Sequence, residues 1–247
     1  MKYLIVSDMH GNSDAFATVL RRVRRKRFDA TLVLGDLVGY GAGPNQVVDA
    51  VRNLSGRVLT VRGNHDKVAS GVESGDNFNA SALVAARWTT DRLTPANLRF
   101  VRDLPRGPLM VEPGVAICHG SPLDEDTYVF SAFEAFEIFT VHTVPVTFFG
   151  HTHVPSLFAQ RGEHVRVALL RGAEGSLVLD PETRYLLNPG SIGQPRDRDP
   201  RAAYMTYDSD TRTVRWFRVE YAIERAQRRI LKAGLPRALA DRLALGM

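Results

Sequence analysis

Short apolar runs and amphipathic segments alternate along the first 65 residues. Three apolar runs predict buried strands: residues 2–7 (KYLIVS), 31–35 (TLVLG) and 57–62 (RVLTVR). A stripe of apolar residues at helical spacing predicts a helix from a cap at Asn12 or Ser13 to about Arg27. Residues 44–54 predict a second helix, with Pro44 in its first turn. This strand–helix–strand–helix–strand order predicts a parallel sheet with helices on its faces.

The pattern changes after this first part of the chain. Residues 79–104 are predicted to be mainly helical, with a break near Pro95, and residues 132–141 predict a further helix. Short apolar stretches, several joined by tight turns, predict strands at 115–118, 146–149, 156–159, 164–170, 175–179, 184–187, 202–208 and 213–220. Two helices are predicted at about 222–232 and 236–244. Residues 67–78 and 120–131 lack either pattern and are predicted to be rim loops.

The order of these elements predicts a single domain over residues 1–247. The chain has no internal repeat, low-complexity segment or long linker. We therefore expect one two-sheet α/β domain with its helices outside. The apolar residues of the C-terminal helices, about 222–244, pack either on this domain or on a second subunit, so a homo-oligomer is one alternative.

Composition and charge narrow the functional classes. The chain has 44% hydrophobic residues, but no apolar run approaches the ~18 residues that cross a bilayer, so no membrane partner is expected. The start, MKYLIVSD, turns polar too early for a secretory signal, and Cys118 is the only cysteine, so a cytoplasmic location is predicted. The net charge is +5, and residues 21–27 are rich in arginine. A solvated helix face is favoured there over a contact with nucleic acid.

Five short polar motifs lie at the ends of apolar runs. In chain order they are Asp8-Met9-His10, Gly35-Asp36, Gly63-Asn64-His65-Asp66, His119-Gly120 and Gly150-His151-Thr152-His153. They contain five of the seven histidines. A packed fold has no reason to end five successive strands with carboxylate, imidazole and amide side chains. Together the motifs predict ligands for two metal ions.

The spacing within the motifs supports this interpretation. Side chains two residues apart on an extended segment point the same way, so Asp8 and His10 are expected to reach one ion, and His151 and His153 one site. Each pair follows a strand, where open α/β sheets bind ligands. The mixed ligand set favours Mn²⁺, with Fe²⁺, Ni²⁺ or Zn²⁺ as alternatives, over Ca²⁺ or Mg²⁺. A carboxylate bridges two ions ~3.5–4 Å apart in two-metal hydrolases.

The five motifs resemble those of the calcineurin-like metallophosphoesterase superfamily, D-x-H, G-D, G-N-H-[DE], H-G and G-H-x-H, in the same order over residues 8–153. Residues 35–41 (GDLVGYG) and 188–193 (NPGSIG) further resemble the YfcE-like bacterial and archaeal phosphodiesterases. The resemblance implies an α/β fold that forms a four-layer α-β-β-α sandwich of two mixed sheets flanked by helices.

The resemblance also implies a role for each motif residue. It assigns the first ion to Asp8, His10, Asp36 and His153. It assigns the second ion to Asp36, Asn64, His119 and His151, so that Asp36 bridges the two. His65 is then no ligand but a catalytic residue that faces the phosphate, where it stabilises charge or protonates the leaving oxygen, and Asp66 orients it.

One departure from the superfamily affects the expected phosphate contacts. Its protein Ser/Thr phosphatases carry Asp-Arg-Gly where this chain has Gly39-Tyr40-Gly41, which disfavours that branch. Phosphate contacts are therefore predicted from Arg196, in the loop 193–198, and from Asn12. A surface role explains Arg196 about equally well, and a helix cap explains Asn12 equally well.

These features predict a phosphoester hydrolase that uses two metal ions. Two cations lower the pKa of a shared water, and the metal-bridging hydroxide attacks phosphorus in line. A phosphodiesterase acting on small nucleotide-type substrates is the first hypothesis. The alternatives are a phosphomonoesterase or a dinucleoside polyphosphate hydrolase, then a nuclease, and from another class a non-catalytic metal-binding scaffold. A cysteine phosphatase is excluded because Asp124 stands where its loop after Cys118 requires arginine.

Overall fold

The first three strands pair in parallel, as the alternating pattern predicts. The computed structural model describes residues 1–247. The first sheet has the order β3-β2-β1-β11-β12-β9, and β11, β12 and β9 join it antiparallel. Its strands are β1 (Lys2–Val6), β2 (Ala30–Val33), β3 (Arg57–Thr60), β9 (Glu174–Val178), β11 (Ala202–Asp208) and β12 (Thr213–Val219).

The second sheet is also mixed, with the order β4-β5-β6-β10-β7-β8. Strands β5, β6 and β10 are parallel, whereas β4, β7 and β8 pair antiparallel with their neighbours. Its strands are β4 (Leu109–Glu112), β5 (Val115–Ile117), β6 (Val146–Phe148), β7 (Ser156–Arg161), β8 (His164–Leu169) and β10 (Arg184–Asn188).

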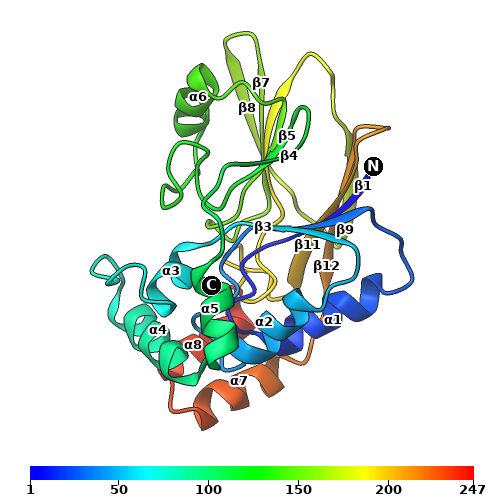
Figure 1. The fold of residues 1–247 in the computed structure, drawn as a ribbon. Coiled ribbons are helices and arrows are strands. Elements are labelled where there is room, and N and C mark those ends of the chain that lie inside the picture. Colours follow the sequence, from blue (N-terminus) through cyan, green and yellow to red (C-terminus); the bar gives the residue numbers. More distant parts are fainter.

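Eight helices complete the chain. They are α1 (Ser13–Val23), α2 (Pro44–Arg52), α3 (Asn64–Ala69), α4 (Ala80–Arg92), α5 (Pro95–Arg102), α6 (Ala132–Val141), α7 (Ile223–Lys232) and α8 (Arg237–Leu245). Figure 1 shows α1, α2, α5 and α7 gathered below the first sheet and α6 alone beside the second. None of these helices has both the length and the apolar character needed to cross a membrane.

Side-chain alternation on the strands produces the layers. On β1, Tyr3 and Ile5 enter the apolar cluster between the two sheets, whereas Leu4 and Val6 enter the cluster beneath α1 and α2. On the other side, Phe139 of α6 packs in a smaller cluster with side chains of the second sheet. The order helices–sheet–sheet–helix confirms the expected four-layer sandwich.

Two elements were missed by the sequence patterns. Strand β4 is an edge strand with partly exposed side chains, so its alternation is weak. Helix α3 lies partly within the predicted rim loop 67–78 and begins at the ligand motif itself. It has only six residues, too few for an amphipathic stripe to be recognised.

The C-terminal helices pack on their own chain. Ile230 of α7 and Leu239 and Leu243 of α8 are buried in one cluster with Tyr40 and Ala82. The buried Asp14 of α1 also forms ion pairs with two arginines of α7. Of the two alternatives for residues 222–244, the structure therefore supports packing within the chain.

Candidate active site

The ligand motifs lie together where parallel strands of both sheets end. Asp8 and His10 follow β1, Asp36 follows β2, and Asn64 begins α3 just after β3. From the second sheet, His119 follows β5, and His151 and His153 follow β6. The carboxyl ends of parallel strands meet at one edge of a sheet, so this placement follows from the topology.

The backbone at these positions is held in an unusual conformation. Five ligand-motif residues have positive φ angles: Asp8 (54°), His10 (46°), Asp36 (53°), His151 (66°) and His153 (61°). Such angles are uncommon for residues with a Cβ and cost roughly 1 kcal/mol or more each. Strain of this kind persists at functional sites, where the surrounding structure holds it in place.

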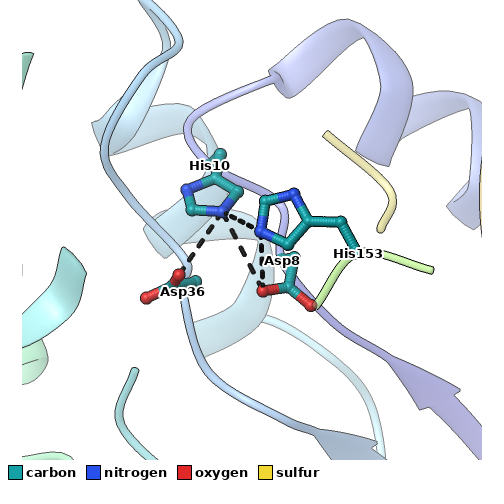
Figure 2. Close-up of side chains that lie close together, drawn as sticks. All are labelled: Asp8, His10, Asp36 and His153. Carbon is teal, nitrogen blue, oxygen red and sulfur yellow. Dashed lines mark hydrogen bonds and ion pairs between the residues drawn. The ribbon is translucent and has the colours of Figure 1, made fainter. Parts of the chain in front are cut away.

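The first cluster contains Asp8, His10, Asp36 and His153, all buried, with ligand atoms within 4.8 Å of one another. Figure 2 shows the two imidazoles and the two carboxylates converging on one point. The Nε2 atom of His10 lies 3.3 Å from Asp36 Oδ2, and Nε2 of His153 lies 3.3 Å from Asp8 Oδ1. The two Nε2 atoms are 3.0 Å apart.

The hydrogen bonds made by Nδ1 of each imidazole decide whether its Nε2 carries a proton or a lone pair. Nδ1 of His10 donates to the Val38 carbonyl at 3.1 Å, and Nδ1 of His153 donates to the Gln194 carbonyl at 2.6 Å. In the neutral rings, the Nε2 lone pairs therefore face each other. A cation held between them would turn this repulsion into coordination. Metal-bound histidines usually donate their other ring nitrogen to a carbonyl or carboxylate, as both rings do here.

The second cluster contains Asp36, His119 and His151. Nε2 of His119 lies 3.4 Å from Asp36 Oδ2 and 3.2 Å from Asn64 Oδ1, while its Nδ1 donates to the Leu34 carbonyl at 2.7 Å. His151 has the opposite arrangement, because its Nε2 donates to the Asp126 carbonyl at 3.0 Å and leaves Nδ1 for a ligand. Asp36 belongs to both clusters, as a bridging ligand requires.

The buried carboxylates of the two clusters also favour the binding of cations. Burial opposes ionisation of Asp8 and Asp36, yet the neighbouring imidazoles outweigh it and hold the pKa of both carboxyls below the usual range. Burial opposes charge on His119 too, but the Asp36 carboxylate raises the pKa of His119 to about 10. The ion-pair partners of both aspartates are histidines, with no lysine or arginine among them. Buried carboxylates without such partners fit metal coordination.

His65 lies beside the first cluster in an aromatic setting. Its ring centroid is 4.8 Å from that of His10, 4.3 Å from that of Tyr40 and 4.5 Å from that of Phe78. Burial, with a smaller contribution from the charge of Arg196, lowers the pKa of His65 to about 4. The imidazole is then neutral near pH 7 and keeps one N–H to donate. Its buried Nδ1 has no hydrogen-bond partner.

The expected contact between Asp66 and the His65 ring is not made. Oδ1 of Asp66 accepts from the backbone amides of Leu37 and Val38, and Oδ2 accepts from the amide of Gly63. The carboxylate thus caps α3 and joins it to the loop after β2. Asp66 therefore contacts backbone amides and not the imidazole, and its role in orienting His65 stays a prediction.

The two predicted phosphate contacts differ. Asn12 caps α1 by accepting from Ala15, and its side-chain amide donates to Gly193 and Tyr221, so its polar atoms already have partners. The helix-cap alternative for Asn12 is therefore confirmed, and its contact with phosphate stays a prediction. Arg196 lies against the ring of Tyr40, and its buried Nε atom has no hydrogen-bond partner.

Residues outside the motifs also shape the site. Asn188 donates to the Gly150 carbonyl and the Thr152 hydroxyl, and Ser191 donates to the Asp8 carbonyl, so residues 188–193 brace the ligand loops. The aromatic residues Phe78 and Tyr128, which contact site histidines, were missed. Both come from segments predicted only as loops, and no local pattern marks them.

Comparisons with known proteins agree with this geometry. The family model described as the calcineurin-like phosphoesterase superfamily domain matches residues 1–212. A crystal structure of a metallophosphoesterase from Sphaerobacter thermophilus is 37% identical, covers 100% of this chain and 99% of that chain, and has a TM-score of 0.86. An uncharacterized protein of Methanocaldococcus jannaschii is 35% identical, over 98% of this chain and 97% of its own length.

Two other similarities are weaker. A symmetrical bis(5′-nucleosyl)-tetraphosphatase of Sodalis glossinidius is 33% identical over 96 residues, which is 38% of this chain and 31% of that protein. Similar structures also include Yfce, a phosphoesterase from E. coli, with 21% identity, 85% of this chain and 90% of that chain covered, and a TM-score of 0.46. At this TM-score the likeness adds nothing to the family match.

Proposed function

The chain belongs to the calcineurin-like phosphoesterase superfamily, and we propose that it is a phosphodiesterase that acts on small nucleotide-type substrates with two divalent metal ions. The observation that carries this proposal is the pair of ligand clusters that share Asp36. Imidazole nitrogen and carboxylate oxygen together favour transition metals, and Mn²⁺ is the ion we propose. The single cysteine supports the prediction of a cytoplasmic location.

Each residue has a proposed part in the reaction. Asp8, His10, Asp36 and His153 hold one ion, and Asp36, Asn64, His119 and His151 hold the other. When bound, two such cations activate water and stabilise charge on a phosphoryl group. His65 donates a hydrogen bond from its neutral ring to the phosphoryl or leaving oxygen. Arg196 contributes positive charge near the same centre, where it lowers the pKa of His65.

A dinucleoside polyphosphate hydrolase is the second candidate. It is favoured by the similarity of 38% of this chain to a protein named as a bis(5′-nucleosyl)-tetraphosphatase. The match covers only 31% of that protein, so the diesterase stays first.

The test of this function is metal-dependent hydrolysis. Metal-stripped protein is assayed on bis-p-nitrophenyl phosphate and p-nitrophenyl phosphate, with Mn²⁺, Ni²⁺, Zn²⁺ or Mg²⁺ added back. We expect diester turnover that depends on metal and that falls by roughly 10²-fold or more in His65→Ala. Asp36→Asn is expected to bind fewer than two ions per chain.

The other outcomes are equally clear. Turnover of the monoester alone contradicts the diesterase proposal and indicates a phosphatase. Two bound ions per chain without turnover of any phosphoester supports the non-catalytic scaffold instead.

A further inference from the structure

A pocket of about 450 Å³ opens beside the candidate metal centre. Asn64, His65 and His151 of the centre belong to its lining, and the remaining wall comes mainly from residues 68–82 and 126–128. This volume falls within the range of small-molecule sites. The pocket therefore has room for one organic arm of a phosphoester whose phosphate lies at the centre.

Two aromatic side chains, Phe78 and Tyr128, belong to the lining of this pocket. The ring of Phe78 lies against His65 with a centroid distance of 4.5 Å. The ring of Tyr128 stacks on His151 with a centroid distance of 3.8 Å and an interplanar angle of 25°. Any nucleobase can stack on an aromatic ring, so a flat heterocycle suits the pocket.

The wall of the pocket is acidic. Glu73, Asp76 and Asp126 line it, and no lysine or arginine does. The buried Lys67 lies 2.7 Å from Glu73 and 2.6 Å from Asp126, so one ammonium serves two of these carboxylates. Asp76 accepts a hydrogen bond only from the Ser74 hydroxyl, at 2.7 Å. The three carboxylates of the wall outnumber the one ammonium that pairs with them, and such a wall accepts base N–H groups and disfavours a second phosphate.

We propose that this pocket binds a single nucleoside arm that carries no phosphate of its own. The substrates are then nucleoside phosphoesters with one phosphate. Dinucleoside polyphosphates and nucleic acids bind poorly, because their next phosphate meets the acidic wall. The inference rests on the proposed function, since it takes the phosphate to lie at the metal centre.

The test uses three diesters with the same leaving group. All are p-nitrophenyl esters, and the second arm is methyl, thymidine through its 5′-oxygen, or the same thymidine with a 3′-phosphate. Because the chemical step is shared, ratios of kcat/KM report the second arm. We expect kcat/KM for the thymidine ester to exceed kcat/KM for the methyl ester by about tenfold or more. We expect the 3′-phosphate to lower kcat/KM at least tenfold, less so at high salt.

Variants link these ratios to the wall. Asp76→Lys is expected to reduce the penalty of the 3′-phosphate at least threefold, and Phe78→Leu to lower the ratio of thymidine to methyl. The matched controls are Glu137→Lys and Phe133→Leu on the exposed surface of α6, away from the pocket lining. Both controls should leave all three kcat/KM values unchanged.

Binding gives a second readout that does not depend on turnover. Calorimetry compares thymidine 5′-monophosphate with thymidine 3′,5′-bisphosphate on the Mn²⁺-loaded protein. Tighter binding of the monophosphate supports the proposal, and equal or tighter binding of the bisphosphate overturns it. The proposal is also overturned if kcat/KM is about the same for the thymidine ester and the methyl ester. Failure of all three esters contradicts the proposed function, while calorimetry still decides the specificity of the pocket.

Discussion

Asp36 is the residue on which both ligand clusters depend. Its Oδ2 lies 3.3 Å from Nε2 of His10 and 3.4 Å from Nε2 of His119. These two histidines follow strands of different sheets. Its Oδ1 accepts from the His65 amide at 2.9 Å, so the same carboxylate also fixes the start of α3. One side chain thus couples the two proposed metal positions to the proposed catalytic histidine.

Gly39 controls the place of the His65 ring. Its φ is +89°, and a Cβ there would lie 2.5 Å from Nδ1 of His65. Phe78 and Tyr40 pack against the same ring, so the imidazole has little freedom to move away. Only glycine leaves room for the imidazole in this position.

Gly39→Ala should therefore lower kcat by about 100-fold, because a displacement of about 1 Å at a reacting group costs that much. Metal content, measured by atomic emission, should stay near two ions per chain. Gly56→Ala is the matched control, since Gly56 also has a positive φ, +82°, but no atom within 4 Å of the added Cβ. Equal activity of the two variants would contradict this role of Gly39.

Among the elements, α3 and the loop 120–131 are joined by Lys67. This side chain is 1% exposed, and its ammonium contacts Glu73, Glu125 and Asp126. Asp126 in turn accepts from His151 through its backbone carbonyl. The lysine thereby connects the wall of the pocket to a proposed metal ligand.

Lys67→Met should destabilise the protein by about 2 kcal/mol, because it leaves carboxylates without their buried partner while two of them stay half exposed to water. Metal affinity should also fall, because the loop that supports His151 loosens. Chemical denaturation and metal titration measure the two effects. Lys232→Met on the surface of α7 is the control, and the idea fails if both variants behave like the parent protein.

At the scale of the elements, the sequence predicted most of the helices and strands. The alternation of apolar runs and helical stripes located β1 to β3 and α1 and α2 because those elements are buried on one or both faces. It missed β4 and α3, whose residues are partly exposed or too few to show a period.

At the scale of the whole molecule, the C-terminal helices α7 and α8 pack against the site on the side of His10 and Tyr40. They lie beyond residues 1–212, the part that the family model matches. Leu239 and Leu243 of α8 line a small hollow together with His10 and Tyr40. Packing of α8 therefore reaches the inner side of the first cluster.

Leu239→Ala should cost about 3 kcal/mol of unfolding free energy, because Leu239 is 2% exposed and its removal leaves a cavity. Leu245→Ala, at a residue 57% exposed, should change stability by less than about 0.5 kcal/mol. Urea denaturation measures both. Equal stability of the two variants would show that α8 is not part of the cooperative core.

The sequence by itself determined which side chains are the candidate metal ligands, the parallel start of the fold and the edge where the motifs meet. These depend on local alternation and on which residue types end each strand. Only the tertiary structure decided which nitrogen each imidazole presents, that Asp66 and Asn12 serve as caps, and that an acidic aromatic pocket adjoins the centre. The reason is that these features depend on contacts between segments far apart in the chain, such as His153 with Gln194 and Asn12 with Gly193.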